Sequence, residues 1–378
     1  MIVSRVRMTN VRSRHELEVE FGQGLTILAG PNGAGKTTVM EAVALVLEGT
    51  PLRAAGVKDL ISKDQGHLRV EVDLEEAGTM VTAAAAYSRD GERRLTANGA
   101  ALADSSRWRE ALPVRTFVPD DLRLIKGSPR RRREYLDTLA ARCEPEYSAT
   151  LRRCEEALAQ RNSLLRVSRG GLPRGAERDQ FAPWESLLAQ TGLAVCRWRA
   201  AALASFVEPF QLTHAALTGD PPGALRLVYR TNVAGLDEDA YQARLEEMRE
   251  GDRQRTYTHL GPHRDDLRLL RNGLDVRDCA SQGEQRTALL TLVLAEWDYR
   301  CTAGGRPLLL LDDVMSELDE ARRRALVTFM GRGGQVVVTT TDLRYFTAEE
   351  LGKATVVELA GGGLRAGPEP DDGGPGGR

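Results

Sequence analysis

The chain has 378 residues, 42% of them hydrophobic and 28% charged, which is typical of a soluble globular protein with room for two domains. Its formal net charge of −2 excludes a constitutively basic protein that coats nucleic acid. It contains no run of about 20 apolar residues that would span a membrane, and its N-terminus lacks the apolar core of a signal peptide. The five cysteines are scattered without C-x-x-C spacing, which argues against a disulfide framework or a zinc site and favours a reducing cytoplasm.

The first third of the chain is predicted to form short strands around one helix. Turn-forming residues separate short alternating or apolar runs, which indicates strands, and helical spacing of apolar residues indicates a helix over 38–47. The predicted strands are Ile2–Met8, Glu16–Phe21, Leu25–Ala29, Leu68–Leu74, Met80–Tyr87 and Val114–Val118.

A glycine-rich loop connects the third predicted strand to this helix. Gly30-Pro31-Asn32-Gly33-Ala34-Gly35-Lys36-Thr37, followed by Thr38, fits the phosphate-loop pattern G-x-x-x-x-G-K-[ST] in its required strand–loop–helix context. Backbone N–H groups of such a loop and the helix N-terminus attract phosphate oxygens. We expect Lys36 to reach the β- and γ-phosphates of a nucleotide and to be catalytic, and the Thr37 hydroxyl to ligate Mg²⁺.

The middle of the chain is predicted to be mostly helical from Ser128 to about Met248. Ser128 is a good N-cap, and Pro129 suits the first helical position. Further helices are predicted over 145–166 and 184–207, separated by a loop rich in Gly, Arg and Ser. Heptads are not sustained, so this region is a short arm and not a long coiled coil.

An acidic strand end near the C-terminus completes the nucleotide site. The run Leu308–Leu311 has the uninterrupted apolar character of a buried parallel strand, and Asp312 and Asp313 follow it. We expect Asp312 to hold Mg²⁺ through water and Asp313 to polarise the attacking water.

A short polar motif precedes this strand. Ser281-Gln282-Gly283-Glu284-Gln285 opens an apolar-rich helix and resembles the signature motif of ATP-binding-cassette ATPases. That class binds ATP between two heads, so the resemblance implies that Ser281, Gln282, Gly283 and Glu284 contact the nucleotide of a second molecule. Ser316–Asp319 resembles the D-loop of the same class.

Three departures from the class pattern bear on turnover. Asp313 stands where the class usually has Glu, and Thr339-Thr340-Thr341-Asp342 follows the next strand without the usual His. A threonine hydroxyl there could sense the γ-phosphate but could not act as a cation, so slow hydrolysis is expected. Asp120 stands where the class often has Gln, which places it near Mg²⁺ by resemblance.

The long interval between phosphate loop and signature motif narrows the class. A helical insertion that splits the ATPase head in this way resembles the organisation of the SMC-like and RecF-like ATPases. In those proteins an arginine near the N-terminus approaches the phosphates, and Arg12 in Thr9–Ser13 matches that arginine. Phe117–Leu122, Pro129–Asp137 and above all Thr258–Leu267, with its G-P-H-R-D-D-L string, resemble the RecF family.

The resemblance implies an α/β fold: an ABC-type P-loop ATPase head with mixed sheets plus an inserted all-helical arm. The expected division is a head over 1–127 and 256–362, an arm over 128–255 and a disordered tail over 363–378. The tail is rich in Gly, Pro and Asp and has too little apolar content to pack.

The same resemblance implies a cytoplasmic, ATP- and Mg²⁺-dependent homodimer of recombinational DNA repair and replication. It would bind duplex DNA next to single-stranded gaps, work with RecR and RecO to load RecA, and hydrolyse ATP weakly in response to DNA. Candidate DNA contacts are Arg130, Arg131, Arg152 and Arg153. The alternative for the run Arg130–Arg133 is a solvated or salt-bridged helix start. His263 and Arg264 are expected in a hydrogen-bonded turn and not in a metal site.

Two other function classes remain open. A small-molecule P-loop kinase would use the helical insertion as a lid, but it leaves Ser281–Gln285 unexplained. A pure interaction protein would bind ATP without turning it over, which the missing Glu and His make conceivable. Measuring phosphate release with and without gapped DNA would distinguish these hypotheses from a DNA-dependent ATPase.

Overall fold

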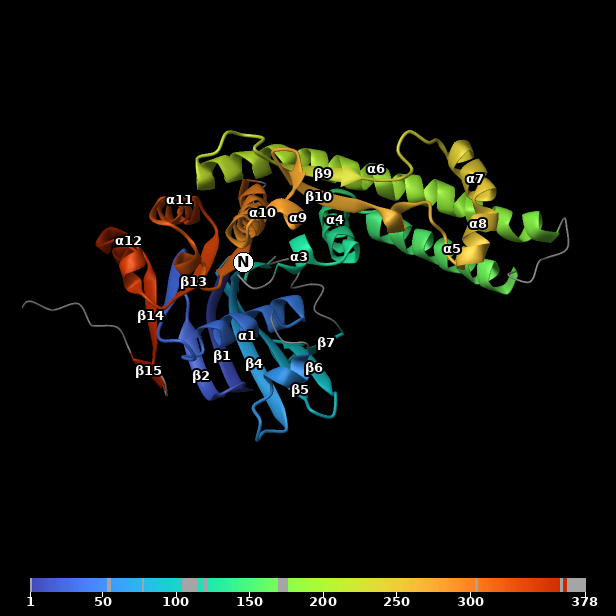
Figure 1. Ribbon diagram of the computed structural model, residues 1–378. Helices are drawn as coiled ribbons and strands as arrows, with labels where there is room; N and C mark the ends of the chain where they lie inside the picture. The colour runs from blue at the N-terminus through green and yellow to red at the C-terminus, as the bar shows by residue number, and fades with distance from the viewer. Residues whose placement is uncertain are drawn as a thin grey trace, which may run out of the picture. The chain divides into compact units, whose positions relative to one another are not determined.

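The structure is a computed structural model that describes residues 2–52, 56–76, 78–103, 114–118, 122–168, 176–302, 305–360 and 363–365. The chain forms two compact units (Figure 1). Unit 1 comprises Met1–Asp121, Ala216–Gly219 and Leu290–Arg378, and unit 2 comprises Leu122–Ala215 and Asp220–Leu289. No helix in the described ranges is long and apolar enough to cross a membrane.

Unit 1 contains two sheets of six strands each. The first is antiparallel, with the order β2-β1-β4-β5-β6-β7. Its strands are β1 (Ile2–Val11), β2 (Arg14–Glu20), β4 (His67–Glu76), β5 (Thr79–Ser88), β6 (Arg93–Ala97) and β7 (Ala100–Leu102). The second has the order β15-β14-β3-β13-β12-β8, and its pairs are parallel apart from β14 with β15. Its strands are β3 (Leu25–Ala29), β8 (Val114–Phe117), β12 (Leu308–Leu311), β13 (Gln335–Thr340), β14 (Thr355–Ala360) and β15 (Gly363–Arg365).

Helix α1 (Lys36–Glu48) joins the two sheets into one core. It contacts β1, β4 and β5 of the first sheet and β13 and β8 of the second. Residues 38–47 of α1 are all buried, which explains why this helix is apolar on nearly every face. The parallel register pairs Ala29 with Thr340 and Leu311 with Val338, so β3, β12 and β13 end at one edge of the sheet. Ligands of open α/β sheets bind at this carboxyl edge.

Shorter helices complete unit 1. They are η1 (Val57–Leu60), η4 (Val314–Glu317), α11 (Glu320–Met330), η5 (Leu343–Tyr345) and α12 (Ala348–Gly352). The helix α10 (Gln282–Thr302) begins in unit 2 and ends in unit 1.

Unit 2 is mostly helical. Its helices are α3 (Arg123–Lys126), α4 (Pro129–Cys143), α5 (Tyr147–Val167), α6 (Ala176–Thr218), α7 (Glu238–Glu247), α8 (Arg249–Arg255), η3 (Pro262–Arg264) and α9 (Val276–Cys279). A three-stranded antiparallel sheet of order β11-β10-β9 accompanies them, with β9 at Leu225–Arg230, β10 at Asp266–Arg271 and β11 at Leu274–Asp275. This three-stranded sheet of unit 2 is separate from the two sheets of unit 1.

Two buried arginines hold the helices of unit 2 together. Arg161 of α5 is fully buried and donates to Glu185 of α6, Asp252 of α8, Thr258 and the carbonyl of Leu245. Arg199 of α6 donates to Asp137 of α4, to Asp265 and to the carbonyl of Pro262. Buried charges are tolerated when every polar group finds such partners.

The predicted α/β architecture with mixed sheets and a helical insertion is the one observed, with three differences. The insertion is not all-helical, because β9 lies inside the range 128–255 and pairs with β10. Gly363–Arg365, which fell in the expected disordered tail, forms β15 against β14; the tail beyond residue 365 lies outside the described residues, as does Asp120. Helix α6 extends beyond the predicted range 184–207 at both ends and runs through Pro183 and Pro209.

Candidate nucleotide site

The phosphate loop follows β3 and turns into α1 through three glycines with positive φ. Gly30, Gly33 and Gly35 have φ of 155°, 81° and 92°. A side chain at Gly30 would also collide, because its Cβ would lie 2.3 Å from the carbonyl oxygen of Leu359. Gly35 is the N-cap of α1 in left-handed conformation. The loop geometry thus depends on glycine at these positions.

A polar cavity of about 450 Å³ opens beside this loop in unit 1. Its volume is in the usual range for small-molecule sites of about 300–1,000 Å³. It is lined by Arg12, Ser13, Asn32, Gly33, Gly35, Lys36, Thr37, Thr38, Asp313 and Glu317. The structure thus brings most of the predicted phosphate-loop residues, Arg12 and Asp313 to one cavity, whereas Gly30, Pro31 and Ala34 do not line it.

Lys36 is folded back onto its own loop. Its Nζ donates to the carbonyls of Gly30 and Pro31 at 2.5 and 3.0 Å. Burial lowers the pKa of Lys36, and the carboxylates of Asp313 and Asp312 oppose that shift. A phosphate in the cavity would favour the charged ammonium further, because an opposite charge stabilises the ionised form.

Two threonine hydroxyls hold the carboxylate of Asp312 from different elements. The Thr37 hydroxyl donates to its Oδ1 and Oδ2, at 2.9 and 3.1 Å, and Thr339 of β13 donates to Oδ1 at 2.8 Å. Asp312 is 2% exposed. This contact links the phosphate loop to the end of β12. Hydroxyl and carboxylate oxygens are the ligands that Mg²⁺ prefers, so the donor set of Thr37 and Asp312 fits the expected metal.

Asp313 has a strained backbone and an unused acceptor. Its φ of 46° is rare for a residue with a side chain. Its N–H donates to the Thr339 hydroxyl at 2.8 Å. Its Oδ1 is buried and has no hydrogen-bond partner among the residues that the structure describes. Strain and unsatisfied polar atoms of this kind concentrate at functional sites.

Arg12 reaches the cavity wall with its guanidinium fixed by Glu41. The Nε–Oε2 and Nη2–Oε1 distances are 2.6 and 2.7 Å, and Glu41 is fully buried in α1. One charge-assisted hydrogen bond, from Nη2 to Oε1, and the ion-pair contact of Nε with Oε2 orient the arginine. Glu41 was not predicted from the sequence, although an acidic residue in the middle of a mostly apolar helix signals a buried partner.

Three more residues at the site were not assigned a role there from the sequence. Arg14 donates through Nη2 to the carbonyls of Ala34 and Ala360, which ties the phosphate loop to the end of β14. Ser13 and Glu317 line the cavity. Ser13 and Arg14 directly follow Arg12, and Glu317 lies in the D-loop-like run. Their positions beside or within these motifs could have indicated that they lie at the nucleotide site.

The signature-like motif forms the start of α10 in unit 2. Ser281 and Glu284 make a capping box: Glu284 Oε2 accepts from the N–H and hydroxyl of Ser281, at 2.8 and 2.9 Å, and the Glu284 N–H donates to the Ser281 hydroxyl. Ser281, Gln282 and Gly283 are exposed. A Cβ on Gly283 would meet no atom within 4 Å.

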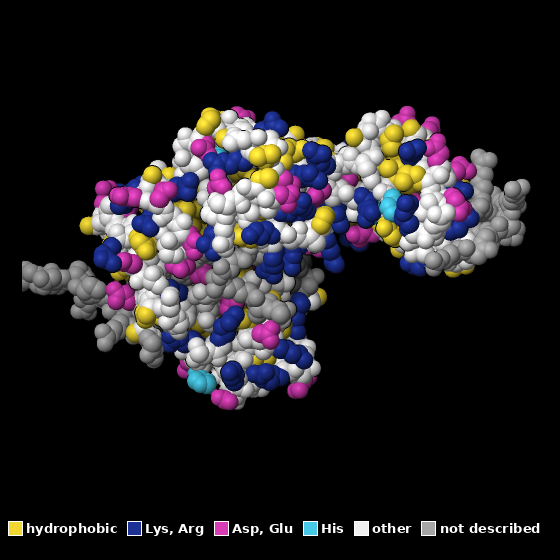
Figure 2. All heavy atoms as spheres, viewed as in Figure 1, with side chains coloured by type: hydrophobic (Ala, Val, Ile, Leu, Met, Phe, Trp, Pro, Cys, Tyr) yellow, Lys and Arg dark blue, Asp and Glu magenta, His cyan; other side chains and the backbone are white. Residues whose placement is uncertain are grey.

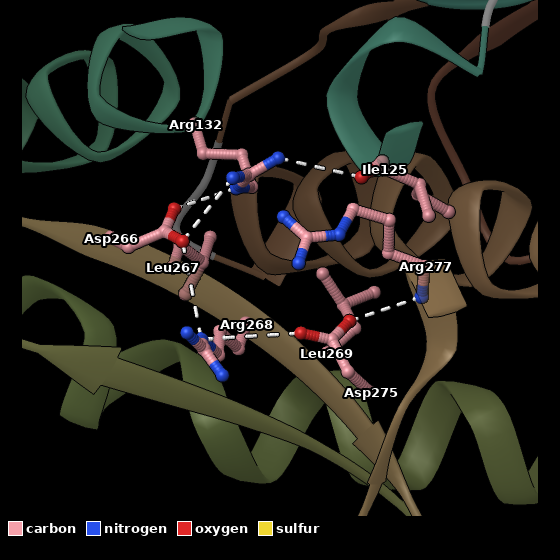
Figure 3. Close-up of a pocket in the computed structure, with 8 residues that line it drawn as sticks. All are labelled: Ile125, Arg132, Asp266, Leu267, Arg268, Leu269, Asp275 and Arg277. Carbon is pink, nitrogen blue, oxygen red and sulfur yellow. Dashed lines mark hydrogen bonds and ion pairs between the residues drawn. The ribbon is translucent and has the colours of Figure 1, made fainter. Parts of the chain in front are cut away.

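Three of the four arginines in the run Arg130–Arg133 make contacts inside unit 2, and Figure 3 shows Arg132 beside Asp266. Arg132 is 3% exposed; it pairs with Asp266, Nε to Oδ1 at 2.6 Å, and donates to the carbonyl of Gly127. Arg133 donates to the carbonyl of Asp265. Arg130 is exposed and pairs with Glu134, and Arg131 is exposed. The salt-bridged alternative therefore holds for Arg132 and Arg130.

The remaining DNA candidates are exposed on α5. Arg152 and Arg153 lie on its solvent side. Figure 2 shows basic side chains interspersed with acidic ones over the face in view, as the net charge of −2 leads one to expect.

His263 lies in a hydrogen-bonded turn. Its Nε2 is 2.8 Å from the carbonyl oxygen of Thr258 and donates to it. Burial lowers the pKa of His263 to about 4, so the ring is neutral at pH 7. The Arg264 guanidinium lies over the Tyr257 ring at 5.4 Å. No group of three metal-binding side chains occurs in the described part of the chain.

Comparison with known proteins places the chain in a family. Residues 2–358 match the model of the RecF/RecN/SMC N-terminal domain. The chain is 35% identical over 373 residues to the DNA replication and repair protein RecF of Heliobacterium modesticaldum, covering 96% of this chain and 99% of that protein. It is 35% identical over 364 residues to RecF of Moorella thermoacetica, covering 95% of each.

Solved structures agree with these matches. The structure of the recombination mediator protein RecF–ATP in the RecFOR pathway superposes with a TM-score of 0.78 at 26% identity, covering 96% of this chain and 97% of that chain. The Smc head domain of Pyrococcus furiosus with an extended coiled coil, bound to the C-terminal domain of ScpA, has a TM-score of 0.57 at 16% identity and shares the fold. The near-complete match to curated RecF proteins, the family model and the phosphate-loop fold together show that the chain belongs to the RecF family.

Proposed function

We propose that the chain is an ATP-binding ATPase of DNA replication and repair. The observation that carries the proposal is the contact of the Thr37 hydroxyl with Asp312, which connects the phosphate loop to the acidic strand end beside the cavity. The RecF relatives at 35% identity and the neighbouring RecF–ATP structure support ATP as the nucleotide.

The cavity residues take distinct roles in this proposal. The phosphate-loop N–H groups and Lys36 bind the β- and γ-phosphates. Thr37 and Asp312 hold Mg²⁺, which when bound neutralises phosphate charge. The unpartnered Oδ1 of Asp313 orients a water and takes its proton, while the water oxygen attacks the γ-phosphorus and ADP leaves. Asp is one methylene shorter than Glu, so water alignment is less favourable and turnover is slow.

ATP is proposed to act across a homodimer. Ser281 and Gly283 are exposed at the start of α10, where N–H groups and a hydroxyl suit the γ-phosphate of a second molecule. Dimerisation would assemble a DNA-binding surface from local arginine patches, since the chain has no basic excess. By family resemblance the DNA is a duplex next to a single-stranded gap, and the partners are RecR and RecO, which load RecA.

The test measures oligomeric state and phosphate release in one set of samples. Wild-type protein with ATP and Mg²⁺ is expected to dimerise by light scattering and to release phosphate faster with gapped DNA. Lys36→Ala should abolish both, whereas Lys353→Ala, an exposed lysine of unit 1 paired with Glu349, should change neither.

Other outcomes decide between the function classes. Wild-type protein that stays monomeric with ATP contradicts the dimer. ATP binding without phosphate release identifies an interaction protein. A phosphorylated small molecule as the product, with no response to DNA, identifies a kinase.

A further inference from the structure

A charged cluster in unit 2 adjoins the signature-like motif. Arg271, at the end of β10, donates through Nη1 to Oε1 of Glu284 and through Nη2 to Oδ2 of Asp220 at 3.3 Å. The Arg271 and Asp220 side chains are each 32% exposed and Glu284 is 41% exposed, so the cluster lies at the surface. Arg271 lies outside the sequence motifs that resemble the RecF family.

Both oxygens of Glu284 are engaged. Oε1 accepts from Arg271, and Oε2 accepts from the N–H and the hydroxyl of Ser281. The same carboxylate therefore binds the arginine and the serine hydroxyl that is proposed to meet a γ-phosphate. Any change in the charge or position of Glu284 reaches Ser281 directly.

The surface in front of this motif has room for an outside group. Gln282 and Gly283 are exposed, and a Cβ on Gly283 would meet no atom within 4 Å. The φ of Gly283 is not positive, so neither packing within unit 2 nor backbone conformation requires glycine there. An incoming phosphate would, however, meet the negative charge of Glu284, and like charges a few ångströms apart repel.

We propose that Arg271 is a positioning residue for ATP-driven dimerisation. It neutralises Glu284 and fixes its carboxylate in place, so that the Ser281 hydroxyl can exchange its bond to Glu284 for one to the partner-bound γ-phosphate, beside the first N–H groups of α10. Asp220 holds the arginine from its other side. The inference rests on the proposed function, because it needs the signature motif to meet ATP across a dimer.

The charge of the cluster defines the test. Without Arg271, the cluster loses a positive charge beside the carboxylates of Asp220 and Glu284, and the incoming phosphate meets a more negative surface. Arg271→Ala is expected to raise the dimer dissociation constant in saturating ATP roughly tenfold, which corresponds to about 1.4 kcal/mol. Binding of a fluorescent ATP analogue to the dilute monomer should change less than about twofold, because the cavity of unit 1 does not contain Arg271.

A double-mutant cycle separates charge from packing. In a Glu284→Gln background, Arg271→Ala should have little further effect on dimerisation, because the amide still accepts from Ser281 and carries no charge. Arg271→Lys, which keeps the charge without the forked geometry, should retain most dimerisation. Arg277→Ala is the matched control, since Arg277 is 34% exposed and pairs with Asp278 on the neighbouring α9.

The outcomes are distinguishable. The inference is overturned if Arg271→Ala dimerises like wild type, or if it is equally defective in the Glu284→Gln background. Melting curves show whether each variant is folded. If Arg271→Ala is not folded, the dimer dissociation constant of Arg271→Lys is compared with that of wild type instead. A wild-type protein that does not dimerise with ATP overturns the proposed function itself, and the inference with it.

Discussion

Thr339 connects the carboxylate of Asp312 with the backbone of Asp313 in the nucleotide site. Its hydroxyl donates to Asp312 Oδ1 and accepts from the Asp313 N–H, both at 2.8 Å. The sequence suggested that a hydroxyl of the Thr339–Thr341 turn senses the γ-phosphate directly. Strand β13 instead continues through Thr340, and Thr339 is fully buried. Its one proton is committed to Asp312, so any sensing by Thr339 acts through the two aspartates.

Asp313→Asn tests the proposed base. The amide keeps the shape of the side chain but does not take a proton from water, and loss of a general base typically costs about 10²–10⁴ in rate. Phosphate release by the variant should fall by that factor, while ATP-driven dimerisation persists. Glu317→Gln is the control, because Glu317 lines the same cavity. Slow turnover in Glu317→Gln with normal turnover in Asp313→Asn would assign the base to Glu317.

At the scale of elements, the presence of regular helices and strands was predictable from the sequence, but the residues at which they end often were not. Leu25–Ala29 was predicted with its observed bounds because turn residues flank it. A helix was predicted over 184–207, yet α6 is longer at both ends and passes Pro183 and Pro209. Local sequence penalises proline inside a helix, and tertiary packing of a 43-residue helix can outweigh that penalty. Strand β9 was missed because its pairing partner, β10, comes much later in the chain.

The site was predictable where a motif carries its own chemistry. Lys36, Thr37, Asp312 and Asp313 were found from the phosphate loop and the leucine run. Glu41 and Arg271 were not, because each acts through contacts that only folding creates. The Arg130–Arg133 run shows the same limit, since its residues are alike in sequence but Arg132 is buried against Asp266 and Arg130 is exposed.

The family-specific string Thr258–Leu267 has a structural role at the element scale. Thr258 and Asp265 supply partners to Arg161 and Arg199, which join α4, α5, α6 and α8. Removing one partner of a buried charge network leaves the others uncompensated.

Arg161→Met should therefore destabilise unit 2 by about 3–5 kcal/mol, because buried Asp252 would lose its arginine and buried Glu185 would keep only Arg249. Urea denaturation followed by fluorescence measures the change. Arg166→Met, an exposed position on the same helix α5, should leave the unfolding free energy within about 0.5 kcal/mol of wild type. A loss below about 1 kcal/mol for Arg161→Met would show that the network is not needed for the fold.

At the scale of the whole molecule, charge decides how DNA can be held. A net charge of −2 gives little general attraction for a polyanion. DNA affinity must therefore come from local arginine patches, and assembling two copies would double each patch. We expect weak binding without ATP and stronger binding with it.

The salt dependence of DNA binding tests whether α5 supplies such a patch. The logarithm of the association constant falls with the logarithm of salt concentration by about 0.9 per phosphate neutralised on duplex DNA. The double variant Arg152→Ala/Arg153→Ala should reduce this slope by roughly 1–2 in the presence of ATP and weaken binding to all sequences alike. The control Arg344→Ala/Lys353→Ala also removes two exposed cations of unit 1, one in η5 and one directly after α12. An equal reduction of the salt slope in the two double variants would mean that total charge, and not a patch on α5, governs DNA binding. An unchanged slope in Arg152→Ala/Arg153→Ala would place the DNA contacts elsewhere.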